Sequence, residues 1–439
     1  MNKFILTPLA ITLSLTLSAC GGSSSESSSG GSSSGGNTAQ LQTIALQTLT
    51  RECGADSAYQ ADVVFHNDDG GAIGSVKTDA EGKFSGELPS GTKHVSVLGD
   101  VFDEEDGGYK QIITELDIEN RTNLGTFFFN DFTGDCGCTE YSVDTTALST
   151  IASDYTIYQS QGNEVSGSVN VCPNDNKLYL TALSSYSVDA KAAIIDIPVN
   201  SSVITLTDED FIHDGVEVPV QLDIDADYAS TRGYIEADNT YRFVQYSGSE
   251  ISNTLFVFPT VTEHNFYVQL DFMSDLMNVD GVDVEFQSYA RSAVDTNGDY
   301  QLTTLPIVTD DLGFSLLQFA ENNDSSFDFG NVDNRFARTI WGYSFLVDDS
   351  AESRFDWTIK AGISGQIPDL SFGSVFPEPT DEVILEELTV LLYGYAGNAT
   401  DATDANSYAK LLDTISEGGH LTKPEFSNYV YTFVSAEIY

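Results

Sequence analysis

Short runs of alternating apolar and polar residues recur along most of the chain after residue 40. Ala61, Val63 and Phe65, for example, alternate with Asp62 and His66, and a period of two places one set of side chains on one face of a strand. Similar extended segments, separated by turn residues, are predicted at residues 177–183, 192–199, 216–224, 233–237, 241–246, 254–258 and 266–272. Long helical patterns are few, so the pattern predicts an all-β chain of two or three tandem β-sandwich domains.

The clearest predicted hairpin lies in the C-terminal third, where two alternating strands flank a turn at residues 348–353. Aromatic side chains at strict alternation on a sheet are usually part of a core, and we interpret them so. A sugar-stacking platform built from Trp341, Trp357, Tyr343 and Phe355 is the alternative. The side chains predicted to share a face are Trp341, Tyr343, Phe345 and Val347 in the first strand and Phe355, Trp357, Ile359 and Ala361 in the second.

The first 19 residues have the layout of an export signal. Lys3 precedes an apolar run from Phe4 to Leu17, and small residues follow before Cys20, as in secretory signal peptides. The stretch Leu17-Ser18-Ala19-Cys20 resembles the lipobox of bacterial lipoproteins. The resemblance implies cleavage before Cys20 and acylation of that cysteine. Because glycine rather than aspartate follows Cys20, the family's usual sorting rule implies the outer membrane.

A tether follows the lipidated cysteine, and together they span residues 20–40. From Gly21 to Gly36 the chain contains only Gly and Ser apart from Glu26. Such a composition lacks the apolar surface that offsets ordering entropy. A flexible chain of this length is expected to hold the folded part on the order of 20 Å from the lipid.

Residues 41–133 carry a series of turn and strand motifs that resembles a known family. Thr78-Asp79-Ala80-Glu81-Gly82-Lys83-Phe84 is followed by Leu88-Pro89-Ser90-Gly91-Thr92, a Val-x-Val strand, and Asn123-Leu124-Gly125-Thr126 before an apolar strand. The series is similar to carboxypeptidase regulatory-like domains of the transthyretin-like type. The resemblance implies an accessory β-sandwich without catalytic residues.

The rest of the chain is expected to form a second β-rich domain at residues 134–306 and a C-terminal β-rich domain at residues 307–439. A segment from Asp295 to Tyr300 echoes the turn that starts at Asp79, which suggests either a second copy of one hairpin or two unrelated Asp/Gly turns. Oxygens at alternate positions around a glycine resemble the start of an EF-hand-type loop. Asp295, Asn297 and Asp299 are therefore candidate calcium ligands, and no other cofactor is expected.

The chain carries 18 Lys and Arg against 67 Asp and Glu, a formal net charge of −49. This charge repels nucleic-acid phosphates and anionic lipid headgroups, so neither is expected as a partner. A solvated acidic surface is the simplest interpretation.

Four cysteines remain once Cys20 is assigned to lipid: Cys53, Cys136, Cys138 and Cys172. An even number in an oxidising compartment indicates disulfides. A bridge between Cys136 and Cys138 would close a very small, strained ring. We therefore expect Cys53 to bond one of these two and Cys172 the other. A metal or redox Cys-x-Cys site is the alternative, but it lacks a nearby histidine and the C-x-x-C spacing.

No catalytic constellation is evident in the sequence. The five histidines are scattered and form no H-E-x-x-H motif, and the carboxylates are too numerous to nominate a glycosidase pair. The main hypothesis is a non-enzymatic, lipid-anchored envelope protein that binds a protein, glycan or cation, or serves in assembly. The alternative is a secreted-type hydrolase of polysaccharide or peptide that uses the N-terminal module as an accessory domain.

Lipidation can be tested directly. We expect radiolabelled palmitate to mark the native protein, and Cys20→Ser to abolish the label and release the chain from the membrane fraction, because the acyl group is its only predicted anchor. Unchanged fractionation of Cys20→Ser would contradict the predicted location.

Overall fold

The computed structural model describes residues 42–437 with gaps, and the predicted signal peptide and tether lie outside the described residues. The prediction of an all-β chain is confirmed, because strands make up 67% of the described part. The α-helices there, α1 (Ile151–Asp154) and α2 (Pro259–Thr262), span four residues each. No helix in this part is long and apolar enough to cross a membrane. The gaps are residues 53–54, 104–106, 120, 133–137, 161, 173–175, 185–187, 221–225, 238–239, 250–253, 263–265, 274–276, 280–281, 302–303, 307–311, 313–324, 348–353, 378–382 and 396–428.

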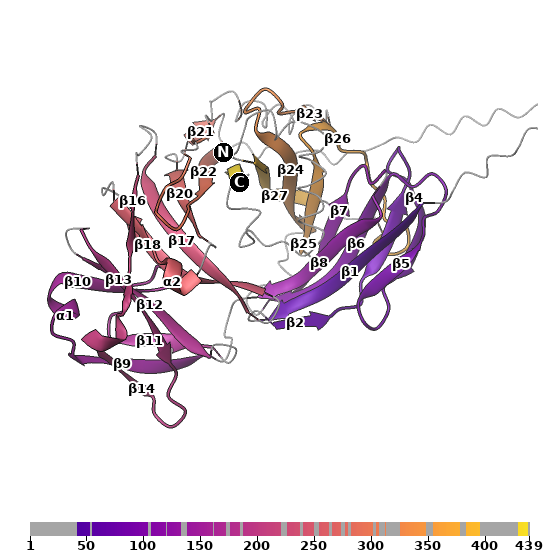
Figure 1. The fold of residues 1–439 in the computed structure, drawn as a ribbon. Coiled ribbons are helices and arrows are strands. Elements are labelled where there is room, and N and C mark those ends of the chain that lie inside the picture. Colours follow the sequence, from indigo (N-terminus) through magenta and orange to yellow (C-terminus); the bar gives the residue numbers. More distant parts are fainter. Residues whose placement is uncertain are drawn as a thin grey trace, which may run out of the picture.

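An N-terminal unit packs two sheets over one apolar core (Figure 1). The first sheet holds β1 (Thr43–Glu52), β2 (Ala55–Ala58), β5 (Lys83–Glu87) and β8 (Asn123–Phe132). The second holds β3 (Asp62–His66), β4 (Ala72–Lys77), β6 (His94–Asp103) and β7 (Gly107–Glu115). The alternation seen in the sequence explains the packing, because the core takes one face of each sheet. Core members are Ile44, Leu46, Val63, Phe65, Val95, Val97, Ile113, Phe127 and Phe129.

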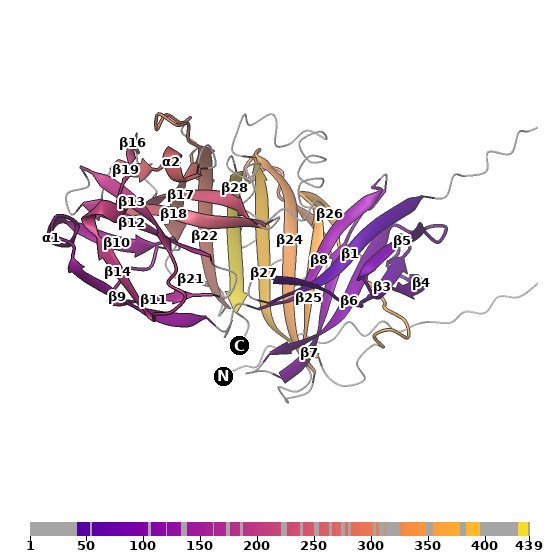
Figure 2. The ribbon, with the colours of Figure 1, turned by 60° about the horizontal axis from the view of Figure 1, so that its bottom comes forward.

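A middle unit has its own core between two smaller sheets, on the opposite side of the molecule from the N-terminal unit (Figure 2). One sheet holds β9 (Thr139–Ala147), β11 (Ser168–Val171) and β14 (Val203–Thr207). The other holds β10 (Tyr155–Gln159), β12 (Lys177–Ser184), β13 (Ala190–Asp196) and β15 (His213–Asp214). The hydroxyl of Thr181 donates to the carbonyl of Tyr246 at 2.8 Å, which ties this unit to the next sheet.

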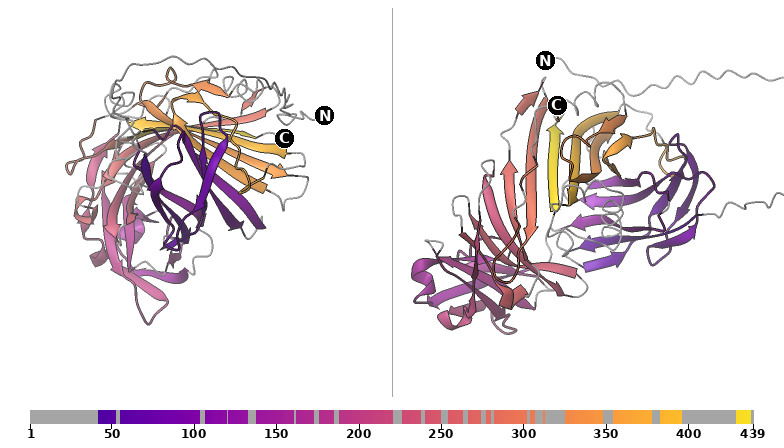
Figure 3. Two further views of the ribbon diagram at one scale, coloured as in Figure 1. Left: turned by 90° about the vertical axis from the view of Figure 1, so that its right-hand side faces the viewer. Right: turned by 45° about the horizontal axis from the view of Figure 1, so that its top comes forward.

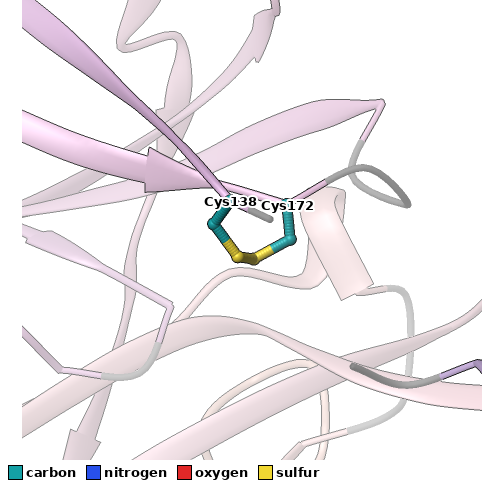
Figure 4. The surroundings of a disulfide bond; sticks show 2 residues. All are labelled: Cys138 and Cys172. Atoms are coloured by element: carbon teal, nitrogen blue, oxygen red, sulfur yellow. A yellow bond between two sulfur atoms is a disulfide. The ribbon is translucent and has the colours of Figure 1, made fainter. Parts of the chain in front are cut away.

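A disulfide joins Cys138 to Cys172, at the entry to β9 and the end of β11 (Figure 4). This pair fulfils the expectation that Cys172 bonds one member of the Cys136/Cys138 pair. Cys53 and Cys136 lie outside the described residues, so their pairing stays a prediction.

One large sheet connects the rest of the described chain, and Figures 1 and 3 show it curving as an arch from the middle unit to the N-terminal unit. It has 13 strands in the order β18-β17-β20-β22-β28-β27-β24-β25-β7-β6-β3-β4, with β21 paired to β22. Strands on both sides of the predicted boundary at residue 306 share this sheet. The strands not yet given bounds are β17 (Tyr228–Ala237), β18 (Thr240–Ser249), β20 (Phe266–Met273), β21 (Met277–Val279), β22 (Val282–Ala293), β24 (Phe336–Val347), β25 (Arg354–Gly362), β27 (Val383–Tyr395) and β28 (Tyr429–Glu437).

The predicted hairpin corresponds to β24 and β25, which pair antiparallel with Trp341 opposite Ile359. Trp341 is fully buried in the largest core, and Tyr343, Phe345 and Trp357 pack against that core. The interpretation of these aromatic residues as core residues is therefore confirmed, and the sugar-stacking alternative is wrong for this face of the sheet.

The large sheet has two faces, which we call outer and inner. The outer face carries the core around Trp341 and is covered by two short strand pairs. These pairs are β16 (Val216–Pro219) with β19 (Thr254–Val257), and β23 (Ser326–Asp328) with β26 (Ser364–Gln366). The inner face is the opposite one. Where β7 lies in the large sheet, this inner face packs against β1 and β8 of the N-terminal unit. Ile113 of β7 belongs to the core of that unit, whereas its neighbour Ile112 points to the outer face and belongs to the core around Trp341.

The N-terminal unit joins the large sheet through the parallel pairing of β7 with β25. On the inner face of this junction, the buried carboxylate of Glu115 contacts Arg338 at 2.7 Å, Arg121 at 2.8 Å and Lys360 at 3.4 Å. Burial raises the pKa of Glu115, but the three cations outweigh burial and lower it to about 2. The carboxylate therefore stays ionised and holds together cations from the N-terminal unit, β24 and β25.

We expect Glu115→Gln to lower the free energy of unfolding by about 3–5 kcal/mol, because it leaves buried cations without their counter-charge. Urea titration followed by tryptophan fluorescence measures the loss. Glu119→Gln is the matched control: the side chain of Glu119 is 58% exposed and pairs with Lys93, so the change should stay within about 1 kcal/mol. Equal effects of the two substitutions would contradict the role given to Glu115.

Candidate functional site

The inner face of the large sheet carries a line of side chains that crosses the strands, which we call the tyrosine row. Each member lies opposite the next in the strand register. Because residues directly opposite each other point to the same face, the row is continuous over six neighbouring strands. Its members, in order, are Tyr228 of β17, Asp271 of β20, Tyr289 of β22, Tyr431 of β28, Tyr393 of β27 and Arg338 of β24.

The rings in the middle of the row contact one another. Tyr289 and Tyr431 are stacked, with ring centroids 4.2 Å apart. Tyr429 lies two residues from Tyr431 in the same strand, and its centroid is 5.5 Å from that of Tyr431 and 5.9 Å from that of Tyr393. Aromatic pairs at these distances add to the stability gained by burial. The row is therefore a packed ladder of rings rather than a set of separate side chains.

A second set of polar side chains runs beside the row. The Arg291 Nε donates to Gln269 Oε1 at 2.7 Å, and the Gln269 amide in turn donates to Asp271 Oδ1 at 2.5 Å. The guanidinium of Arg291 also lies over the ring of Tyr267, 4.5 Å from its centroid. These contacts orient Asp271 from the side of β20 and β22.

Asp271 is the carboxyl group of the row. Burial raises the pKa of Asp271 to about 6, although the hydrogen bond from Gln269 and the charges of Arg291 and Arg232 oppose this shift. Near neutral pH this group therefore changes between a carboxylate, which only accepts hydrogen bonds, and a carboxylic acid, which also donates one.

The members of the row differ in exposure. Tyr289, Tyr431, Asp271 and Gln269 are half-buried, so part of each side chain meets solvent. Their supports are buried, namely Tyr267, Tyr393, Tyr429, Arg291 and Arg338. A rigid buried layer below partly exposed phenol, carboxyl and amide groups is an arrangement that can bind a ligand by hydrogen bonds and ring contacts.

The sequence did not single out the tyrosine row. The sequence gives only a local signal for the row. Tyr267, Gln269 and Asp271 occupy alternate positions in the strand predicted at residues 266–272, and Tyr289 and Arg291 are also two residues apart. Alternation shows that such residues share a face, but which strands lie side by side is set by pairings far apart in the sequence.

The predicted calcium ligands lie in a tight turn closed by an isolated bridge between Val294 and Tyr300. Asp295 Oδ1 accepts hydrogen bonds from the backbone N–H groups of Asn297 at 2.8 Å and Asp299 at 3.0 Å. These bonds lower the pKa of Asp295. No group of three or more His, Cys, Asp or Glu side chains among the described residues could hold a metal ion. Calcium binding stays a prediction.

The turn at Asp295 has the same construction as the one at Asp79. Asp79 Oδ1 accepts the backbone N–H of Lys83 at 2.7 Å, and glycines with φ of +72° and +84°, Gly82 and Gly298, occupy the same place in the two turns. The two turns are therefore similar in backbone geometry as well as in sequence. In both turns, the acidic side chain satisfies backbone donors of its own loop.

The outer face carries a buried chain of hydrogen bonds at the β7–β25 junction, which we call the His66 relay. Trp357 Nε1 donates to Thr114 Oγ1 at 2.9 Å, Thr114 lies 2.7 Å from Ser96 Oγ, and Ser96 lies 2.8 Å from His66 Nε2. His66 Nδ1 lies 3.2 Å from the carbonyl of Gly70. An indole only donates and a carbonyl only accepts, so the direction is set from both ends. His66 is neutral, with its proton on Nδ1.

The His66–Ser96 contact has the spacing of a nucleophile and its base, but it does not form an accessible site. His66 and Ser96 are both fully buried under the outer core, and Phe372 packs edge-on against the imidazole, with centroids 5.7 Å apart. The relay therefore holds strands together rather than meeting a substrate.

No protein-family model matches the chain, and comparisons with curated proteins and with solved structures find no similar protein. The resemblances to the lipobox and to carboxypeptidase regulatory-like domains therefore stay predictions, and function is argued from the site alone.

The His66 relay predicts a pH dependence of stability. Burial lowers the pKa of His66 to about 4, whereas an unfolded histidine titrates near pH 6.5. The unfolded state thus binds more protons between these values, so stability is lost as pH falls from about 7 to 4, by up to about 3 kcal/mol. Burial also raises the pKa of Asp271 and lowers the pKa of His94, so both groups contribute in this pH range. Urea titrations at several pH values should therefore show that the stability advantage of the wild type over His66→Gln shrinks by up to about 3 kcal/mol as pH falls from about 7 to 4. His213→Gln, outside the relay, should keep the wild-type profile, and a profile unchanged by His66→Gln would contradict the assignment.

Proposed function

We propose that the chain is a lipid-anchored envelope protein that binds a ligand, without catalysis, at the tyrosine row. The observation that carries the proposal is the row itself: half-buried Tyr289, Tyr431 and Asp271 over a buried support on the inner face. Tyrosine contributes large contact area at low entropic cost together with a hydroxyl for hydrogen bonds.

The anchor in this proposal rests on the sequence. Leu17-Ser18-Ala19-Cys20 matches the pattern at which bacterial lipoproteins are cleaved and acylated, and the Gly/Ser tether behind it separates the folded part from the lipid. Glycine after Cys20 supports the outer membrane as the location. A binding protein held there acts within reach of a bilayer.

The flanking units in this proposal are accessory. We infer that the N-terminal unit is a β-sandwich of the transthyretin-like type, supported by its motifs and by the two sheets packed around one core. Its role is to fix one end of the arch through β7. The middle unit, with its separate core, would fix the other end through β12 and β18.

A photo-crosslinking experiment tests the proposal. A diazirine side chain in place of Tyr289, in the full-length protein expressed in its own cells, should yield an adduct of increased mass after irradiation. The same side chain in place of Tyr343 is the matched control, because Tyr343 packs against the outer core on the other face. We expect an adduct at position 289 only, detected by mass spectrometry of the purified protein.

Two results would overturn the proposal. One is the absence of an adduct at position 289 under conditions in which the protein is anchored and folded. The other is an equal yield at positions 289 and 343, which would show that labelling does not depend on the tyrosine row.

A further inference from the structure

We infer that the ligand of the tyrosine row is an uncharged polysaccharide whose chain lies across the strands. This inference rests on the proposed function and names the class of molecule bound. It follows from the direction of the row, from the side chains that are partly exposed, and from the contacts that the arginines of this face make within the protein.

The row follows the sheet across its strands. Its members occupy successive strands of one sheet, and neighbouring strands lie about 4.8 Å apart. Its partly exposed members run from Tyr228 to Tyr431 and cover roughly 14 Å, since three strand spacings separate them, while Tyr393 and Arg338 beyond them are buried. One spacing is close to the length of one pyranose unit in an extended glycan, so successive sugars can meet successive side chains. An extended peptide advances by a shorter step per residue and would not keep this match.

The partly exposed groups are suited to hydroxyls, which both donate and accept. Tyr289 donates its hydroxyl to Gln287 Oε1 at 3.0 Å, and the Gln287 amide donates to Glu285 Oε1 at 3.2 Å. Together with Gln269 and Asp271, these side chains form a band of phenol, amide and carboxyl groups on one face. A phenol or an amide can both donate and accept hydrogen bonds, and a carboxylate can accept several.

The arginines of this face are engaged with protein groups. Arg291 is 6% exposed and hydrogen-bonded to Gln269, and Arg338 is 0% exposed and bonded to Glu115. Arg232 lies over the ring of Tyr246, 4.7 Å from its centroid. Among the described arginines at the row, Arg291 and Arg338 are buried and Arg232 is half-buried. A carboxylate or sulfate on a ligand would thus meet a chain of net charge −49 with few accessible guanidinium groups in this described part, which disfavours an anionic polymer.

A protein partner fits the row less well. Protein interfaces depend on a few large side chains that are desolvated on binding. Here Tyr267, Tyr393 and Tyr429 are already buried within the chain. Tyr289 and Tyr431 stack one ring face against each other, so that face is not available to a partner. What remains is a narrow polar band with ring edges, which suits a thin hydroxylated chain.

Affinity electrophoresis of the purified Cys20→Ser chain tests the inference. The probes are soluble neutral polymers, namely a β-1,3-glucan, a β-1,4-glucan and a galactan, with alginate as the anionic polymer and gelatin as the polypeptide. We expect at least one neutral polymer to retard the protein. Tyr289→Phe and Tyr431→Phe, which keep the rings and remove the hydroxyls, should each weaken binding about fivefold. Tyr343→Phe, on the outer face, should bind as the parent does, and melting curves verify that each variant folds.

The outcomes separate this inference from the proposed function. Retardation by alginate or gelatin alone, or neutral-polymer binding that the Tyr289 and Tyr431 variants do not change, would overturn the polysaccharide assignment. A polypeptide adduct in the photo-crosslinking experiment at position 289 would also overturn it, while leaving the tyrosine row as a binding site. A lack of any adduct there would instead remove the proposed function.

Discussion

The pairing of β7 with β25 is the constraint on which the rest of the structure depends. It joins an N-terminal unit to strands of the last third of the chain, and Glu115 and Arg338, which meet across it, are 223 residues apart in sequence. A carboxylate surrounded by three cations on the inner face and the His66 relay on the outer face hold this junction from both sides. Such buried polar contacts permit one register only, because a slip would leave charges and donors without partners.

The junction also explains the tyrosine row. Arg338 is both the last member of the row and a partner of Glu115, so the row ends in the same buried cluster that joins the two parts of the sheet. A site made of side chains from separate strands needs each strand held to a fraction of an ångström. The arch and its flanking units provide this support, and the exposed groups of the row stay positioned without a ligand.

The sequence predicted local features well and long-range ones poorly. Alternation identified the hairpin around Trp341 and Trp357, since its two strands are neighbours in the chain. The turn pattern at Asp79 and Asp295 was recognised because its hydrogen bonds close within a few residues. The parallel pairing of β7 with β25, by contrast, has no local signature, and the fold was expected to consist of tandem sandwiches. For the same reason the sequence could not bring Tyr289, Tyr431 and Tyr393 together, as each belongs to a different strand.

Native-state hydrogen exchange tests most directly whether one continuous sheet supports the site. If the β7–β25 pairing governs the fold, backbone amides of Ile112–Thr114 and Trp357–Ile359 should exchange with the same free energy of opening as those of the tyrosine-row strands β22, β27 and β28, and should belong to the slowest class. The account would be contradicted if the amides of β7 opened together with the rest of the N-terminal unit at a lower free energy while those of β22, β27 and β28 stayed protected. In that case the N-terminal unit would be an independent domain, and the junction would not support the row.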